Sequence, residues 1–478
     1  MNLLKRIPDS PLANWLMMLV MATAIMMLLS YDSYLHLLRP RVDSAWFFMC
    51  GKAWMNGMVP YVDFADSKGP LLWLIYGVGY LLSHYDYHGV FWVSVVVYSF
   101  TFYFLFKTAH IFLESRSQAI MAVLITSVAI FNPITHEETR AEDFGMFFTA
   151  LSLWQLCRML YAEHTERDER TAFFAFGISL AGTLLIKYNI TAMCGIFPAI
   201  GLCYLLREHH PVWRPLLACA AGFAALTLPF LIYFLIQGNF SAFIQEYFIN
   251  TLQTIENAVT LQYGDMKLFF MVWLAQLIGV ICMSSSLKQY RMEPVLIWIW
   301  FFSLIFIVAK HSYYYCAIGC FWIFPFVYLL NKLNKHMFGL LICSIIVLSL
   351  WTYKMLWHTS GTIMTKDYAN AIDKSELLFH NKPKPTVIIK GMEKGYGVTA
   401  GILPGCKYWT LQNGYTEEMD NNNTNAILNS ECDYVILGNK SGFRGKRSRT
   451  IWRKWLNEHG YISLFLEEDS TEIWFKQQ

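Results

Sequence analysis

Long apolar runs recur along most of the chain and are separated by short polar loops. The first run extends from Leu12 to Ser30, and ten more lie near residues 88–106, 118–134, 144–161, 171–186, 190–206, 215–236, 268–286, 294–309, 313–330 and 337–356. A helix that crosses a bilayer needs about 20 mostly apolar residues, so the shorter runs must extend into flanking polar residues. The pattern predicts an all-α polytopic membrane protein with about 11 to 13 transmembrane helices.

Two shorter helices are predicted in the long loop after the first run. The segment Pro70–Leu82 has only thirteen residues and contains two glycines, which favours an interfacial or re-entrant helix over a span. Between Trp46 and Trp54, apolar residues recur at three- and four-residue steps. This spacing predicts a helix that lies in the membrane interface and has Asp43 at its start.

The end of the chain has the pattern of a small α/β domain. Strand-like segments occur at residues 386–389, 433–437, 461–465 and 472–475, with a helical segment around 447–459. We therefore expect a membrane module over residues 1–357, with interfacial helices within 31–83, and a separate α/β domain over 358–478.

Composition and charge placement support a membrane protein and suggest its orientation. The chain is 56% hydrophobic and only 15% charged, against about 25% in typical soluble domains. Its net charge of +3 gives no reason to expect a nucleic-acid partner. When Pro70–Leu82 is not counted as a span, Lys and Arg concentrate in the loops on one side. The positive-inside rule then places the N-terminus in the cytoplasm, and loops 31–69 and 237–267 and the tail outside.

The ionisable residues that could carry chemistry cluster at the outer ends of the predicted spans. One acid, Asp43, follows the first span, and Glu142 and Asp143 end an acid-rich turn that begins at Thr135. Asp43 is equally compatible with a helix cap, and the turn with a solvated loop. Nearby cations and hydrogen-bond donors that could hold a phosphate are Lys68, Arg140, Lys187, Lys310, His311 and Tyr314. Taken singly, each fits an interface anchor. Taken together, acids that activate a hydroxyl and cations that stabilise a departing phosphate suit group transfer from a phospholipid carrier.

These residues resemble the GT-C glycosyltransferases related to protein O-mannosyltransferases and, most closely, to the lipid A aminoarabinose transferase. Asp43 is similar to the first-loop catalytic acid of that family, and Asp143 to its second acid. The stretch Gly57-Met58-Val59-Pro60-Tyr61, followed by Lys68-Gly69-Pro70-Leu71, resembles a family motif that usually has proline after the lysine. Lys187 and Lys310-His311-Ser312-Tyr313-Tyr314 are similar to a later lysine and a later tyrosine motif. The doubled acid leaves open whether Glu142 or Asp143 is catalytic.

The resemblance implies a GT-C-like fold and transfer of a sugar from a polyprenyl-phosphate donor, with inversion, on the extracytoplasmic face. The acceptor could be a lipid, a polysaccharide or a protein. No cofactor is required for a monophosphate leaving group, although a divalent cation is compatible with paired acids. A transporter or flippase of lipid-linked sugars, or a membrane scaffold, is the alternative. We expect a bacterial plasma membrane location, and leave open whether Cys406 and Cys432 form a disulfide.

Overall fold

A computed structural model describes most of the chain. The described residues are 9–30, 32–35, 43–84, 86–131, 139–250, 266–287, 289–308, 312–332, 375, 379, 383–391, 395–398, 401–410, 417–438, 449–466 and 471–476. By their internal contacts the residues fall into two units. The first contains residues 1–35, 94–230 and 260–356, and the second contains 36–93, 231–259 and 357–478. The boundary expected from the sequence at residue 357 stays a prediction.

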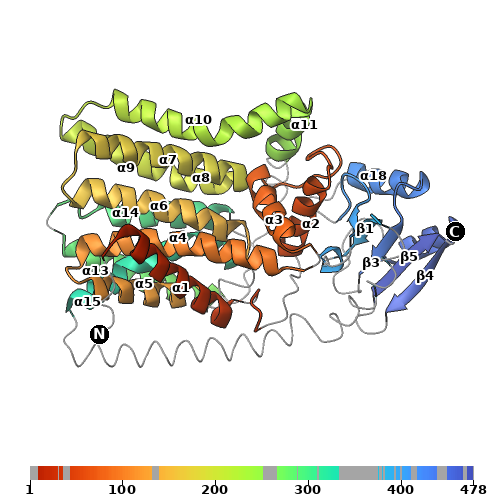
Figure 1. The fold of residues 1–478 in the computed structure, drawn as a ribbon, viewed down its shortest axis with the longest axis horizontal. Coiled ribbons are helices and arrows are strands. Elements are labelled where there is room, and N and C mark those ends of the chain that lie inside the picture. The colour runs from red at the N-terminus through yellow and green to blue at the C-terminus, as the bar shows by residue number, and fades with distance from the viewer. Residues whose placement is uncertain are drawn as a thin grey trace. The chain divides into compact units, whose positions relative to one another are not determined.

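The first unit is a bundle of apolar helices. Its elements, some of which continue into the second unit, are α1 (Pro11–Leu29), α4 (His88–Phe112), α5 (Arg116–Ile130), α6 (Ala141–Tyr161), α7 (Glu166–Ile186), α8 (Tyr188–Cys194), α9 (Ile196–Arg207), α10 (Trp213–Ile236), α13 (Met266–Ser285), α14 (Glu293–Val308), the 3₁₀ helix η3 (Ser312–Trp322) and α15 (Ile323–Lys332). Figure 1 shows α6, α7 and α9 running side by side, and the three are in contact.

Helices coincide with ten of the eleven predicted spans, and the run at 337–356 lies outside the described residues. Among the described residues, six helical segments are long and apolar enough to cross a membrane: Pro11–Leu29, His88–Phe112, Glu166–Ile186, Tyr188–Arg207, Trp213–Ile236 and Tyr314–Lys332. The segment expected as one span at 190–206 is divided at Gly195 into α8 and α9. The prediction of a polytopic helical membrane protein is confirmed.

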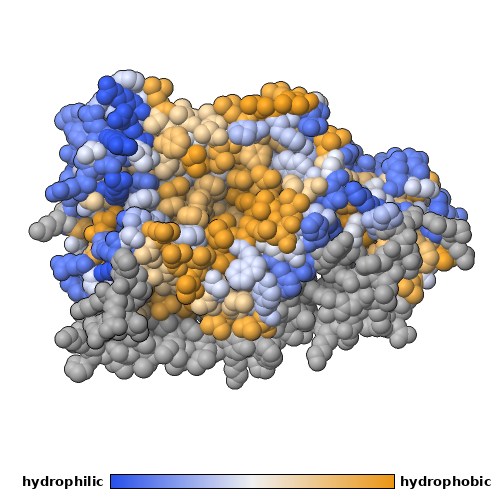
Figure 2. Space-filling model, viewed as in Figure 1, coloured by the Kyte–Doolittle hydropathy of each residue, from blue (hydrophilic) through white to orange (hydrophobic). Residues whose placement is uncertain are grey.

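The outer surface of this unit is apolar, as a bilayer requires. Leu216, Leu217 and Leu228 on α10 are 44 to 59% exposed. Figure 2 shows hydrophobic residues over the flanks of the helices, and hydrophilic residues at the left, where the α6–α7 and α9–α10 loops lie. Several exposed leucines along one long apolar helix suit the hydrocarbon of a bilayer better than water, which fits a lipid-facing surface.

The second unit contains two helices that pack closely together. These are α2 (Asp43–Met55), which begins at the predicted acid, and α3 (Pro70–Leu82), which has the bounds expected from the sequence. A Cβ atom added to Gly51 would lie 2.5 Å from the backbone nitrogen of Gly77. The two backbones therefore touch where both residues lack a side chain, and every residue of α2 from Ser44 to Ala53 is buried.

The second unit also contains the α/β domain and a short helical segment. The latter consists of α11 (Phe240–Phe243) and the π-helix η2 (Ile244–Ile249). The sheet has five strands in the order β2-β1-β3-β5-β4, namely β1 (Thr386–Lys390), β2 (Leu403–Pro404), β3 (Tyr434–Leu437), β4 (Tyr461–Leu466) and β5 (Thr471–Lys476). Strands β1, β2 and β3 are parallel, and β5 is antiparallel to β3 and β4.

Two helices pack on this sheet: α18 (Glu417–Leu428), which is labelled beside it in Figure 1, and α19 (Arg449–Glu458). Their buried residues Ile427 and Trp452 share a core with Val435 of β3. The four predicted strands and the helix around 447–459 are confirmed, whereas β2 and α18 were not expected. Cys406 and Cys432 are both free thiols in this structure.

Candidate active site

The start of α6 holds the second predicted acid, Asp143, by hydrogen bonds to both carboxylate oxygens. Oδ2 accepts the backbone N–H of Arg140 at 2.8 Å, which caps the helix. Oδ1 accepts the hydroxyl of Tyr98 on α4 and lies 3.5 Å from the thiol of Cys316 on η3. The residue is 3% exposed. Asp143 therefore ties two helical elements, α4 and η3, to the first turn of α6.

The neighbouring acid, Glu142, forms an ion pair with Lys187. The Lys187 ammonium donates to Oε1 of Glu142, and both side chains are buried, at 11% and 4% exposure. Lys187 is the single residue between α7 and α8, so its backbone bends away from the helix and its side chain can reach α6. The same ammonium lies 3.9 Å from the ring centroid of Tyr314 on η3. The structure thus brings together Arg140, Glu142, Asp143, Lys187 and Tyr314.

The other predicted site residues that are described, Asp43 and Lys68, belong to the second unit. Asp43 is the first residue of α2 and is partly exposed. The Lys68 ammonium lies 5.7 Å from the ring centroid of Phe47, one helical turn after Asp43, and 3.2 Å from the hydroxyl of Ser67. Within the described residues, Lys68 has no carboxylate partner. This half-buried ammonium is thereby left able to bind an added anion.

The loop that carries Lys68 is rigidly built around Tyr61. This buried tyrosine has a φ of +66°, a strained conformation for a bulky residue, and its hydroxyl donates to the Lys68 carbonyl at 2.9 Å. Burial raises the pKa of Tyr61 well above its usual value, so the hydroxyl keeps the proton it donates. A further bond runs from the Ala65 N–H to the Lys407 carbonyl at 2.9 Å. The α/β domain therefore helps to hold this loop.

Two site residues predicted from the sequence lie outside the described residues, and two buried acids were not predicted as site residues. Lys310 and His311 lie outside the described part. Asp32, which is 4% exposed, accepts the Thr139 N–H at 2.6 Å and so steadies the chain before α6. Asp66, in the sequence just before Lys68, is 2% exposed. A buried acid leaves no local signature, and only the proximity of Asp66 to the lysine motif could have suggested it.

The comparisons with known proteins agree with this architecture. The sequence model of the dolichyl-phosphate-mannose-protein mannosyltransferase family matches residues 67–246. The crystal structure of ArnT from Cupriavidus metallidurans bound to undecaprenyl phosphate has a TM-score of 0.63 at 12% identity, covering 96% of this chain and 97% of ArnT. Its apo structure has a TM-score of 0.60 at 12% identity, covering 98% of each chain. The sequence matches no curated protein.

The chain resembles the GT-C glycosyltransferases. This resemblance, expected from the short motifs of the sequence, is supported by the family match and by a fold shared over nearly the whole chain. At 12% identity the likeness to ArnT establishes the fold and leaves residue roles to be argued from this chain. Among the described residues of this GT-C-like protein, no group of three His, Cys, Asp or Glu side chains is arranged to hold a metal ion.

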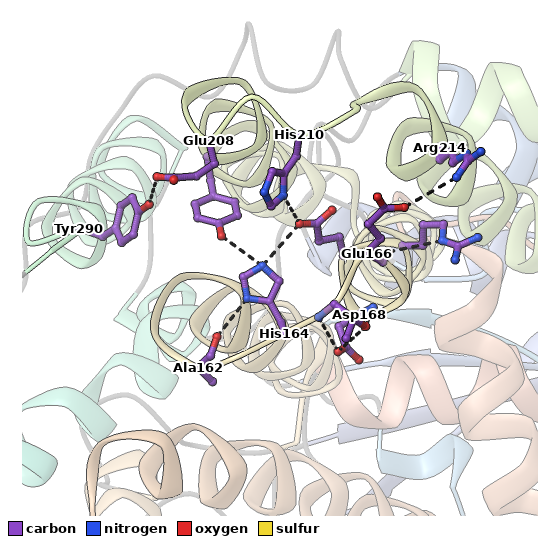
Figure 3. Close-up of polar contacts among 12 residues, drawn as sticks. Ala162, His164, Glu166, Asp168, Glu208, His210, Arg214 and Tyr290 are labelled. Atoms are coloured by element: carbon purple, nitrogen blue, oxygen red, sulfur yellow. Dashed lines mark hydrogen bonds and ion pairs between the residues drawn. The ribbon is translucent and has the colours of Figure 1, made fainter.

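A second polar cluster lies at the opposite end of α6, which is roughly 30 Å long at 1.5 Å per residue. Oε1 of buried Glu169 lies 2.5 Å from His210 Nδ1 and 3.5 Å from His164 Nε2, and Figure 3 shows these two imidazoles close together. The Tyr204 hydroxyl lies 3.1 Å from His164 Nε2. A cation at this end of α6 also has an acidic partner, since Arg158 forms an ion pair with Asp168. The two ends of the GT-C-like bundle thus carry separate polar clusters.

Proposed function

We propose that the protein transfers a sugar from a polyprenyl-phosphate donor to a hydroxyl acceptor, on the extracytoplasmic face and with inversion. The observation that carries this proposal is the buried pair of Glu142 and Lys187 beside Asp143, at the ends of membrane helices in a chain with the ArnT fold. Undecaprenyl phosphate, which is bound in that ArnT structure, has the chemistry of the leaving group. A bacterial plasma membrane with the N-terminus in the cytoplasm fits the loop charges.

In this proposal, Asp43 is the general base that takes the proton of the acceptor hydroxyl as the hydroxyl attacks the anomeric carbon. The bond from that carbon to the phosphate oxygen breaks in the same displacement, and the phosphate leaves as an anion. The Lys68 ammonium lies 5.7 Å from the ring centroid of Phe47, which stands one helical turn after Asp43 on α2, and it has no acid partner in the described part, which suits it to the phosphate. A preorganised donor of this kind contributes about 3 to 4 kcal/mol of transition-state stabilisation.

The residues around α6 divide into two roles. Lys187 and Arg140, with Tyr314 and the predicted Lys310 and His311, are proposed to stabilise the departing phosphate. Glu142 is proposed to keep the Lys187 ammonium in place through their ion pair. Asp143, whose two oxygens already accept hydrogen bonds, is proposed to position the start of α6. Alternatively, Asp143 together with Glu142 orients the acceptor or assists Asp43 as a second base. A divalent cation remains compatible with the chemistry but is not required.

The test is transfer from radiolabelled polyprenyl-phosphate sugars by purified protein with membrane extract, comparing wild type with Asp43→Asn. General-base removal is expected to lower the rate by about 10² to 10⁴-fold without changing expression. Asp86→Asn is the matched control, because Asp86 is a partly exposed acid of the same unit that bonds locally to Ser83 and His88. Full transfer by Asp43→Asn would eliminate Asp43 as the base.

The rival function is transport of lipid-linked sugars without chemistry. Movement of labelled lipid across vesicles with no released polyprenyl phosphate, and no effect of Asp43→Asn, would favour the transporter. A membrane scaffold would be favoured if replacing Glu142 and Asp143 together left function intact in folded protein. The resemblance to glycosyltransferases favours transfer over both alternatives.

A further inference from the structure

An open cavity of about 840 Å³ lies at the end of the bundle away from Glu142. Its walls include Phe112 and Tyr161, the last residues of α4 and α6, together with Tyr204 in the last turn of α9 and Leu287 just after α13. The cavity is large enough for a ligand, since binding sites for small molecules have volumes of about 300 to 1,000 Å³. None of its residues belongs to the proposed transfer site.

The electrostatics of this cavity favour a cation. Four helices, α4, α6, α9 and α13, have their C-terminal ends at or beside it, and a helix C-terminus carries a partial negative charge. Glu163 lines the rim, is exposed, and has no hydrogen-bond or ion-pair partner within the described residues. Two cations described at this end of the bundle are engaged, because Arg158 pairs with Asp168 and Arg207 lies 5.2 Å from the ring centroid of Tyr290.

The side chains on the walls suit an ammonium group in particular. Tyr161 and Tyr204 present aromatic rings, which attract ammonium ions through their negative faces. His210 also lines the cavity, and its Nδ1 lies 2.5 Å from a carboxylate oxygen of buried Glu169, to which it donates when it carries the proton. With both ring nitrogens protonated, Nε2–H can also donate to the phosphate of a zwitterion whose ammonium meets Glu163.

The location of the cavity favours a membrane lipid as the molecule that carries the ammonium group. The cavity is bounded by the ends of helices predicted to cross the bilayer, at the level where lipid headgroups lie. Part of its lining is aliphatic, from Ile111, Leu160 and Leu287, which suits the glycerol and upper acyl region of a lipid. We propose that this cavity binds the ammonium headgroup of a zwitterionic phospholipid of the phosphatidylethanolamine type. The proposal is independent of the reaction at the other end of the bundle.

The experiment measures lipid retention by native mass spectrometry after the full chain is equilibrated with equal amounts of phosphatidylethanolamine and phosphatidylglycerol. Wild type is expected to retain phosphatidylethanolamine preferentially. Glu163→Gln should lower that preference about three- to tenfold, the range of a cation–π or charge contact. Glu163→Lys should abolish it by repulsion. Glu114→Gln is the matched control, because Glu114 is also an exposed acid at this end of α4 but does not line the cavity.

Three results would overturn the proposal. Equal retention of both lipids by wild type would show that the cavity does not select an ammonium group. A preference that survives both Glu163→Lys and Tyr204→Leu would place the selectivity elsewhere on the protein. If free ethanolamine in solution displaced the lipid completely and raised the unfolding temperature as much as the lipid does, the ligand would be a soluble amine.

Discussion

Removing both members of the Glu142–Lys187 ion pair is expected to destabilise the protein no more than the worse of the two single removals. The pair is buried, with exposures of 4% for Glu142 and 11% for Lys187. Breaking a buried pair from one side costs about 3 to 5 kcal/mol, because the remaining charge is left without compensation. Replacing both members by neutral groups removes that penalty, so the double variant should cost no more than the worse single variant.

The magnitudes for the two single variants should also differ. In Glu142→Gln the ammonium keeps its contact with the Tyr314 ring, at 3.9 Å from the centroid, whereas Lys187→Met loses both contacts. A desolvated cation–π contact contributes about 2 kcal/mol, although the carboxylate left behind by Lys187→Met can also take a proton. We therefore expect Glu142→Gln to lower the free energy of unfolding by about 3 kcal/mol and Lys187→Met to lower it by at least as much. The coupling free energy between the two positions should be about 3 kcal/mol.

The assay is reversible unfolding of the purified protein in mixed micelles, with the four proteins of the cycle compared under one condition. Tyr314→Leu added to Glu142→Gln isolates the aromatic contribution. Single-variant costs that sum to the double-variant cost within about 0.5 kcal/mol would mean that the two charges do not interact. That result would remove the argument that Glu142 holds the Lys187 ammonium in place for a phosphate.

Two further predictions concern α2 and its surroundings. Gly51→Ala is expected to lower the free energy of unfolding by about 1 to 3 kcal/mol and to abolish transfer. The added Cβ would lie 2.5 Å from the backbone of Gly77 and would push α2, which carries Asp43, away from α3. Gly195→Ala, whose Cβ would meet nothing closer than 3.4 Å, should be nearly neutral in the same thermal-unfolding and transfer assays. Burial lowers the pKa of Lys52 from 10.5 to about 7, so folding favours the neutral amine. Stability should therefore rise by up to about 1.4 kcal/mol per pH unit between pH 7 and pH 10, whereas below pH 7 both states bind the proton and the cost of burying the charge is constant. Lys52→Met should lack this slope in thermal unfolding followed against pH.

The helices could be predicted from the sequence because the bilayer imposes a length of about 20 apolar residues on each span. The bounds of α3 were predicted as well, since Pro70 starts the helix and a polar stretch follows Leu82. The helix α18 was missed because its sequence, EEMDNNNTNAIL, is rich in asparagine, a weak helix former. It is stabilised instead by Ala426 and Ile427 in the core beneath it, which is a tertiary effect.

The candidate site was predictable only as far as its contacts are local. Asp143 bonds to the Arg140 N–H three residues away, which is a helix-cap pattern that a sequence can show. Its bond from Tyr98, 45 residues earlier, follows from the packing of α4 on α6. The pairing of Lys187 with Glu142, also 45 positions apart, needs the break between α7 and α8 to turn the lysine inward. Residue type and order suggested candidates, and packing supplied their partners.

The partners of the three acids argue for different roles. Asp143 has hydrogen bonds to both oxygens and is buried, so taking a proton from an acceptor would disrupt the cap of α6 and the bond from Tyr98. Glu142 is the counterion of a buried lysine, and protonating it would leave that charge uncompensated. Asp43 stands at the partly exposed start of α2, where it can change protonation at a lower structural cost. A general base must gain and release a proton in every turnover, and of the three Asp43 meets this requirement best.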